Sequence, residues 1–238
     1  MHARRSIVFL LGLVFCFLGA LPASADDTVL SVVAVRVNPG QMDTYAARVG
    51  QLQGVMERLD AAGTIAIWRA TAAGEATGSV FVAIQYPNLA AYADGTAKTA
   101  GDAEFAKLIG GLDDIRTIGS SSLFRNVFGG GGNDPGELLQ TVTVKVAPGR
   151  LDDYVAKLQQ LSAISERVGG GGTMRAWQAT AAGTNTGNVI VGIIHESLVS
   201  YANSTTKIQA DPEWQKIISG LDDMRTIVSR GLSRRITP

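Results

Sequence analysis

Two stretches of the chain carry one pattern: Val35-Arg-Val-Asn-Pro-Gly-Gln-Met-Asp-Thr-Tyr45 and Val144-Lys-Val-Ala-Pro-Gly-Arg-Leu-Asp-Asp-Tyr154. Each residue of the second stretch lies 109 positions after its counterpart, as 144 minus 35 shows. Two further pairs of stretches keep this offset: Trp68–Gly74 with Trp177–Gly183, and Gly111–Ile118 with Gly220–Ile227. A constant offset means that the copies are joined without insertion or deletion, so the chain is a tandem duplication of one unit.

Each copy is predicted to fold as strand, helix, strand, strand, broken helix and strand. Residues 29–37 are rich in β-branched side chains and end at Pro39-Gly40, which is typical of a strand closed by a turn. Apolar residues then recur at spacings of three and four, as on one face of a helix over 42–59. The later segments of the first copy are predicted as strands at 64–71, 79–86 and 115–126 and as helices at 89–98 and 103–109, and the last strand of the second copy at 224–235.

The second piece of the broken helix has recognisable ends. In the second copy, Asp211-Pro212-Glu213 supplies an N-cap, a proline at the first helical position and an acid at the positive end of the helix dipole. Gly111 and Gly220 are placed to end this helix in the two copies.

This order of elements leaves one face of each sheet uncovered. Two helices cover one face of a four-stranded antiparallel sheet, and the other apolar face needs a partner, for which the sister copy is the obvious candidate. With its strand-Pro-Gly-helix opening, which leads to Tyr45 or Tyr154, and its stretch Tyr201–Ile218 containing Asp-Pro-Glu-Trp, the sequence resembles the dimeric α/β-barrel superfamily of ferredoxin-like units. That superfamily includes the antibiotic-biosynthesis-monooxygenase-like and NIPSNAP-like proteins.

The resemblance implies an architecture for the whole chain. Such families pair two chains into one barrel, so this chain looks like a covalent pseudo-dimer. We therefore expect an α+β protein in which two ferredoxin-like βαββαβ units form one intramolecular α/β barrel, as a monomer.

The first 25 residues are predicted to be a signal peptide. Arg4 and Arg5 form a basic start, residues 7–21 are apolar, and Ala23-Ser24-Ala25 has the small-x-small pattern of a cleavage site. A membrane anchor is the alternative, but the apolar run is shorter than the roughly 20 residues that span a bilayer. We expect a mature chain that begins at Asp26, is periplasmic or secreted and has no stable membrane anchor. Its expected parts are a first repeat at 26–128, a glycine-rich linker at 129–136 and a second repeat at 137–238.

Cleavage would narrow the available chemistry, because Cys16 and His2 would be lost. The mature chain would then have no cysteine and one histidine, His195, which excludes disulfides, a cysteine nucleophile and a Cys/His zinc cluster. Lys and Arg number 21 and Asp and Glu 21, and no basic stripe stands out. We therefore expect no nucleic-acid partner, and a solvated C-terminal tail carrying Arg230, Arg234 and Arg235.

The lumen between the sheets is the expected ligand pocket, and strand alternation predicts which residues face it. On the first strand Val33, Val35 and Val37 should face the helices, which leaves Val32, Ala34 and Arg36 for the lumen. In the second copy the lumen-facing set includes Thr141 and Thr143. Trp177 shares a strand face with Arg175, whose charge disfavours a dry core, so Trp177 and its counterpart Trp68 are expected in the lumen. The alternative for both tryptophans is core packing or lids at the barrel ends.

His195 replaces Tyr86 of the first copy at the end of the third strand. The two side chains are candidates for the pocket wall, and His195 is the candidate catalytic residue because an imidazole can exchange a proton near neutral pH. The alternative is a strand-end histidine without a catalytic role. The expected mature chain offers no second histidine to form a metal pair, so no metal site is predicted.

Two classes of function remain open. The first is an exported protein that binds a small apolar or aromatic molecule without a cofactor, with Trp177 stacking and Arg175 pairing with a carboxylate or carbonyl of the ligand. The second, implied by the resemblance, is a cofactor-independent monooxygenase or a haem-degrading type of enzyme with Trp68, Trp177 and His195 in the cavity. The haem-degrading relatives combine asparagine, tryptophan and histidine in each site, whereas only the second copy here has a histidine, and its first strand contains no asparagine.

Overall fold

A computed structural model describes residues 26–132 and 136–236 of the chain. The predicted signal peptide lies outside these residues. The first repeat contains β1 (Val29–Val37), α1 (Met42–Arg58), β2 (Thr64–Ala72), a 3-10 turn η1 (Gly74–Ala76), β3 (Val80–Tyr86), α2 (Leu89–Ala100), α3 (Ala103–Asp113) and β4 (Arg116–Phe128). The second contains β5 (Leu138–Val146), α4 (Leu151–Arg167), β6 (Thr173–Ala181), a 3-10 turn η2 (Gly183–Asn185), β7 (Val189–His195), α5 (Leu198–Ala210), α6 (Pro212–Ser219) and β8 (Arg225–Ile236). The order predicted from the sequence is confirmed in both copies.

The broken helix ends differently in the two repeats. Asp211 caps α6 as predicted, because its Oδ1 accepts hydrogen bonds from the backbone N–H groups of Glu213 and Trp214 at 3.0 and 2.9 Å. Gly220 follows the last residue of α6, but α3 continues through Gly111 to Asp113. The prediction that Gly111 ends its helix is therefore wrong. Gly111 instead leaves room for Arg48, whose guanidinium donates to the Gly111 carbonyl.

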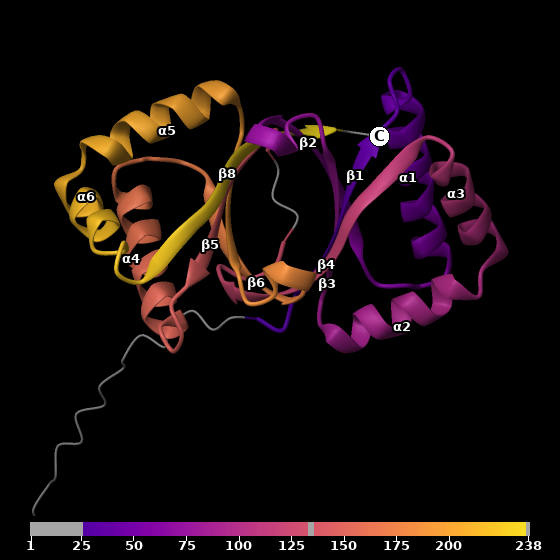
Figure 1. The fold of residues 1–238 in the computed structure, drawn as a ribbon, viewed down its shortest axis with the longest axis horizontal. Coiled ribbons are helices and arrows are strands. Elements are labelled where there is room, and N and C mark those ends of the chain that lie inside the picture. Colours follow the sequence, from indigo (N-terminus) through magenta and orange to yellow (C-terminus); the bar gives the residue numbers. More distant parts are fainter. Residues whose placement is uncertain (1–25, 133–135, 237–238) are drawn as a thin grey trace, which may run out of the picture.

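The eight strands form one closed barrel in the order β1-β3-β2-β8-β5-β7-β6-β4. Four of these strands belong to each repeat, and the repeats meet at two antiparallel seams, β2 with β8 and β4 with β6. Figure 1 shows the strands at the centre, with α1–α3 outside one half and α4–α6 outside the other. The sister copy thus supplies the missing partner by completing the ring of hydrogen bonds as well as by facing the other sheet.

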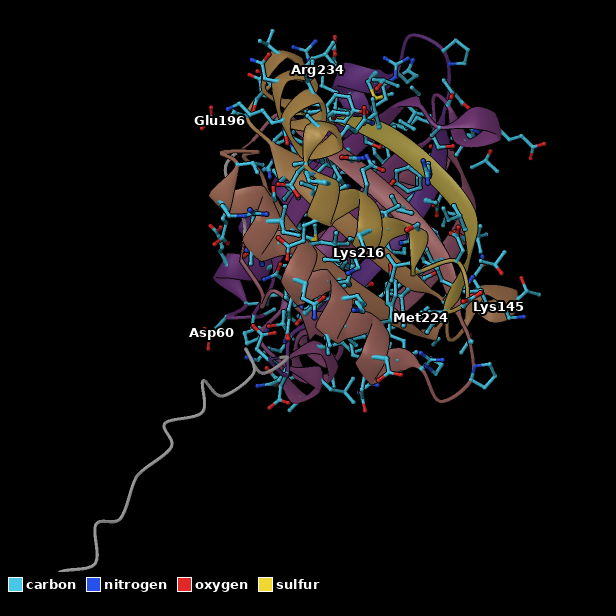
Figure 2. The ribbon with its side chains drawn as sticks, turned by 90° about the vertical axis from the view of Figure 1, so that its left-hand side faces the viewer. Asp60, Lys145, Glu196, Lys216, Met224 and Arg234 are labelled. Carbon is cyan, nitrogen blue, oxygen red and sulfur yellow. The ribbon has the colours of Figure 1, made fainter. Side chains whose placement is uncertain are left out.

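The helices pack on the outer face of the barrel, and the two main apolar cores lie between helix and strand. In the first repeat Val33, Val35 and Val37 pack with Tyr45 and Val49 of α1. The all-valine face of β1 therefore meets the helices, as predicted. Figure 2 looks onto the corresponding helical layer of the second repeat, with Lys216 of α6 near its middle. No helix within the described residues is long and apolar enough to cross a membrane.

Candidate functional site

The barrel contains a cavity of about 400 Å³ that is partly open to solvent. This volume lies within the range of small-molecule sites, which is about 300–1,000 Å³. Its wall is largely apolar, with two tryptophans, two phenylalanines, and threonine and serine hydroxyls. The described lining residues are Leu30, Val32, Thr64, Ala66, Trp68, Ala73, Ala76, Phe81, Ala83, Gln85, Phe124, Gly132, Leu139, Thr141, Thr143, Arg175, Trp177, Ile190, Gly192, Ile194, Ser229, Arg230, Gly231, Ser233 and Arg235.

Strand alternation explains this wall. Inward residues occupy every second position, as Thr141 and Thr143 do on β5 and Arg175 and Trp177 on β6, while the residues between them face the helices. Val32, Trp68, Trp177, Arg175, Thr141 and Thr143 are all in the cavity wall, where the sequence placed them. Their role in binding a ligand stays a prediction.

Trp68 lies at the seam between β2 and β8. Its direct neighbours in the sheet are Phe81 on β3 and Arg235 on β8. The Arg235 Cζ lies 4.6 Å from the centroid of the Trp68 ring, which is a cation–π contact. Trp68 is only 4% exposed, so this seam presents a buried indole and a guanidinium side by side in the cavity wall.

Trp177 occupies the equivalent place at the opposite seam, where its partner on β4 is Asn126 instead of an arginine. The Asn126 Nδ2 donates to the Gly130 carbonyl at 3.0 Å, and the Arg175 Nη1 donates to the same carbonyl at 2.9 Å. Asn126 and Arg175 are both buried. This seam is therefore bound to the chain that leaves β4.

That segment, residues 129–132, is here called the glycine strap. Besides the two bonds to Gly130, the Gly131 N–H donates to Asp26 Oδ2 at 2.6 Å. With the Gln85 amide oriented to satisfy both groups, its oxygen accepts from the Gly132 N–H at 2.6 Å and its nitrogen donates to the Gly132 carbonyl at 3.3 Å. The composition predicts a flexible linker, but its described part is fixed against the barrel and contributes Gly132 to the cavity wall.

Tyr86 and His195 do not line the cavity, and their prediction as pocket residues is wrong. On β3 the inward residues are Phe81, Ala83 and Gln85, so Tyr86 faces outward. The same alternation on β7 turns His195 outward from its inward-facing neighbour Ile194. Strand-end position alone does not reveal which face of the sheet a side chain is on, and the structure places Ile190, Gly192 and Ile194 on the inner face of β7.

His195 is instead a core residue between β7 and α5. It is 2% exposed and packs edge-to-face against Tyr201, with ring centroids 5.4 Å apart. In the described part of the chain neither ring nitrogen has a hydrogen-bond partner, and a Cβ at Gly172 would lie 3.1 Å from Nδ1. Burial lowers the pKa of His195 below its ordinary value.

The structure adds two features of the site that the sequence analysis does not predict. The sequence predicts a solvated tail for Arg230 and Arg235, but β8 extends to Ile236 and places both in the cavity wall, Arg230 at an exposed position. Arg234, which lies between cavity-lining neighbours, points outward, is 71% exposed and pairs with Glu137 at 3.6 Å. Alternation along β8 predicts that Arg234 and Arg235 lie on opposite faces of the sheet. The pairing of β8 with β2 decides which of the two faces the lumen. The aromatic residues Phe81 and Phe124 were also missed.

The described wall does not fit a haem iron. Axial ligands to haem come from histidine, cysteine, methionine or tyrosine, and none of these is among the described lining residues. His195 lies in a packed layer outside the lumen, with no room beside its Nδ1. Across the described ranges no group of three or more His, Cys, Asp or Glu side chains is placed to hold a metal ion.

No protein-family model and no curated protein sequence matches the chain. Solved structures do match the chain. A candidate monooxygenase from Lactobacillus acidophilus superposes with a TM-score of 0.61 at 8% identity, covering 89% of this chain and 94% of the other. An anthrone oxidase-like protein gives 0.56 at 14% identity, covering 89% and 92%.

Chlorite dismutase from Candidatus Nitrospira defluvii, in the form of a variant with one arginine replaced by lysine, gives 0.54 at 10% identity, covering 90% and 92%. Each match covers both repeats, at identities that carry the fold alone. The chain therefore has the dimeric α/β-barrel fold in its tandem-duplicated form, as found in chlorite dismutase and in these monooxygenase-like structures.

Proposed function

We propose that the protein binds a planar, largely apolar small molecule in the barrel lumen. The observation that carries the proposal is the lumen cavity of about 400 Å³, with Trp68 and Trp177 in opposite walls. Indole rings offer broad apolar faces for stacking. A wall of apolar side chains with a few hydroxyl, amide and guanidinium groups is the usual composition of a site for such ligands.

Binding can be tested without knowing the natural ligand. The full mature chain, beginning at Asp26, is purified from its own host and analysed by native mass spectrometry for a retained compound. Anthrone, the compound in the name of one structural relative, is titrated separately while tryptophan fluorescence is followed. We expect saturable quenching that is lost in Gly192→Trp, because Gly192 lines the lumen and a large side chain there fills it. Saturable quenching that persists in this variant would place binding outside the lumen.

Oxygenation of the bound molecule is the second candidate function. It is supported by the fold shared with the monooxygenase-like structures and by arginines in an apolar wall, since a fixed cation in a low-dielectric site stabilises an anionic oxygen of a substrate. In this reaction an activated methylene carbon of the substrate loses two hydrogens and gains one atom of O2 as a carbonyl oxygen. The second oxygen atom leaves as water, so O2 is the only oxidant needed.

This second function has its own measurement. Anthrone and the protein are mixed in an oxygen-electrode cell, and the product is identified by its mass. Oxygen uptake above the spontaneous rate, with one O2 consumed per anthrone, would support oxygenation. Binding of anthrone without oxygen uptake above the spontaneous rate would contradict oxygenation of this compound and favour the binding function.

We also propose that the chain is exported and works as a monomer. The N-terminal sequence of protein from the native host should begin at Asp26. Asp26 has a structural role, because its carboxylate accepts a hydrogen bond from the Gly131 N–H of the glycine strap.

A further inference from the structure

We propose that ligands enter and leave the lumen through a mouth between η1 and the first half of β8, and that Phe124 closes the equivalent place in the other half of the barrel. This inference rests on the proposed binding function and adds the route to the site. The mouth, here called the η1 mouth, is formed by Ala73, Ala76, Ser229 and Arg230.

The η1 mouth lies where β8 extends beyond its pairing with β2. The strand β8 covers Arg225–Ile236, but its ladder with β2 begins only at Leu232 (Figure 1). Before that point β8 pairs with β5, and β2 gives way to η1. Ser229 and Arg230, in this first half of β8, are exposed and also line the cavity. Side chains that are both exposed and cavity-lining mark a place where the cavity meets solvent.

The rim of the η1 mouth is held on both sides of η1. Arg36 of β1 donates from Nη1 to the Thr77 carbonyl at 3.0 Å and from Nη2 to the Glu75 carbonyl at 2.6 Å. On the other side, a Cβ at Gly231 of β8 would lie 3.0 Å from the Ala73 Cβ, so the chain entering η1 packs closely on β8. The opening is therefore part of the folded barrel.

The equivalent place in the other half, between η2 and β4, does not reach the cavity. The counterparts of the four mouth residues are absent from the cavity wall as far as the chain is described: Ala182, Asn185, Ser120 and Ser121. Phe124 packs there with Trp177 and Ala182 in one apolar cluster. Phe124 and Trp177 both line the cavity, so this cluster forms the wall that separates the cavity from η2.

One difference between the repeats accounts for the open and the closed side. The counterpart of Phe124, 109 positions later, is Ser233. Ser233 also lines the cavity and is 4% exposed. The tryptophan and the alanine of the cluster are the same in both halves. A serine lacks the aromatic ring that fills the wall on the η2 side, and the cavity therefore continues to η1.

The test obstructs the two equivalent places one at a time. The mature chain beginning at Asp26 contains no cysteine, so Ser229→Cys and Ser120→Cys can each be modified with a maleimide that carries a polyethylene glycol chain. Both serines are exposed and occupy equivalent positions in the repeats. Entry and release of 1-aminoanthracene, a planar apolar probe, are followed by stopped-flow fluorescence.

We expect the label at position 229 to slow both entry and release by at least about tenfold, because access to the bound state is restricted. The dissociation constant should stay unchanged, since an obstructed passage alters the barrier and not the bound state. The label at position 120 is the matched control and should change either rate by less than about twofold.

A second variant tests the role of Phe124. Phe124→Ser, introduced into the labelled Ser229→Cys protein, gives the η2 side the residue found on the η1 side. It should restore part of the lost entry rate by opening a second mouth. Circular dichroism checks that each protein is folded. A folded variant without any recovery would show that Phe124 does not close the η2 side.

The other outcomes separate the mouth from the binding function. Unchanged rates with the label at 229 would contradict the η1 mouth while binding stands, and slowing by a label at Thr64→Cys instead would move the entrance to the start of β2, where an exposed residue also lines the cavity. Equal slowing by the labels at 229 and 120 would make the effect one of the polymer. A wild-type protein that does not bind the probe would remove support from the mouth and from the proposed function together.

Discussion

Position 195 holds a histidine where the first repeat holds Tyr86, and the two side chains occupy equivalent places between sheet and helix. Tyr86 packs edge-to-face on Tyr92 at 5.2 Å, as His195 does on Tyr201 at 5.4 Å. A Cβ at Gly95 would lie 3.4 Å from the Tyr86 ring, and the counterpart of Gly95 in the second repeat is Ser204. The edge-to-face packing of a strand residue on a helix tyrosine is therefore the same in both repeats.

Burial of His195 predicts a pH dependence of stability. The folded protein holds the imidazole with a pKa lowered by desolvation, with Tyr201 on α5 and Gly172 before β6 next to it. The unfolded chain therefore binds a proton more readily. The contribution to stability is constant above the unfolded pKa, which is about 6.5, and stability is lost as the pH falls below that value towards the folded pKa.

The measurement is the urea midpoint of the full chain between pH 8 and pH 5. The variant His195→Tyr with Ser204→Gly reproduces the pair found in the first repeat and has no imidazole at this position. We expect the wild-type protein to lose more stability than the variant on acidification, because only the wild type has the buried imidazole. The carboxylates titrate in both proteins, so the difference between the two curves reports on His195. Parallel curves would show that His195 is not held neutral by the fold.

At the scale of elements, the glycine strap decides how the second seam is built. Its backbone groups bind side chains from both repeats, Asp26 and Asn126 from the first and Arg175 from the second. A Cβ at Gly131 would lie 2.5 Å from Thr28 Oγ1 and 2.7 Å from the side-chain amide of Gln85. The strap thus requires a glycine at this position for steric reasons.

Gly131→Ala should therefore destabilise the protein. Overpacking of this kind typically costs about 1–3 kcal/mol of unfolding free energy. Gly101→Ala is the control, because a Cβ there meets no atom within 4 Å. It should be neutral or stabilising by up to about 1 kcal/mol, through lower entropy of the unfolded chain. The unfolding free energies of the two variants are compared by urea denaturation. Equal stabilities would mean that the strap shifts to accommodate a Cβ at position 131 without cost.

At the scale of the whole molecule, each repeat completes the other. Without the second repeat, β2 loses β8 and β4 loses β6, so the first repeat has two unpaired strand edges and an open apolar sheet face. Unpaired edges are templates for pairing with another chain. The fused chain removes both edges within one molecule.

A first repeat expressed alone, residues 26–128, is therefore expected to self-associate through the same edges. Light scattering coupled to size exclusion should give a dimer or larger species, whereas the full mature chain should elute as a monomer. A well-folded, soluble and monomeric first repeat with no concentration dependence would contradict this interpretation of the seams.

Much of the barrel follows from local patterns. The stripe of Tyr45, Val49 and Leu52 predicts α1, and the valines of β1 predict which face meets it, because helices and strands expose residues with fixed periods. The same period of two places Trp68, Trp177 and Arg175 in the lumen. It fails for His195, because both faces of β7 are apolar and a composition of this kind does not mark the inner one.

The duplication, the order of elements and the inward face of several strands were thus determined by the sequence itself, through the offset of 109 residues and the spacing of apolar side chains. Only the tertiary structure decided that Arg235 stacks on Trp68, that Arg175 binds Gly130 and that the strap is fixed against the barrel. These contacts join residues of different repeats, or of a strand and a glycine segment. Their formation depends on which strand edges pair across the two seams, and no periodicity along the chain encodes that choice.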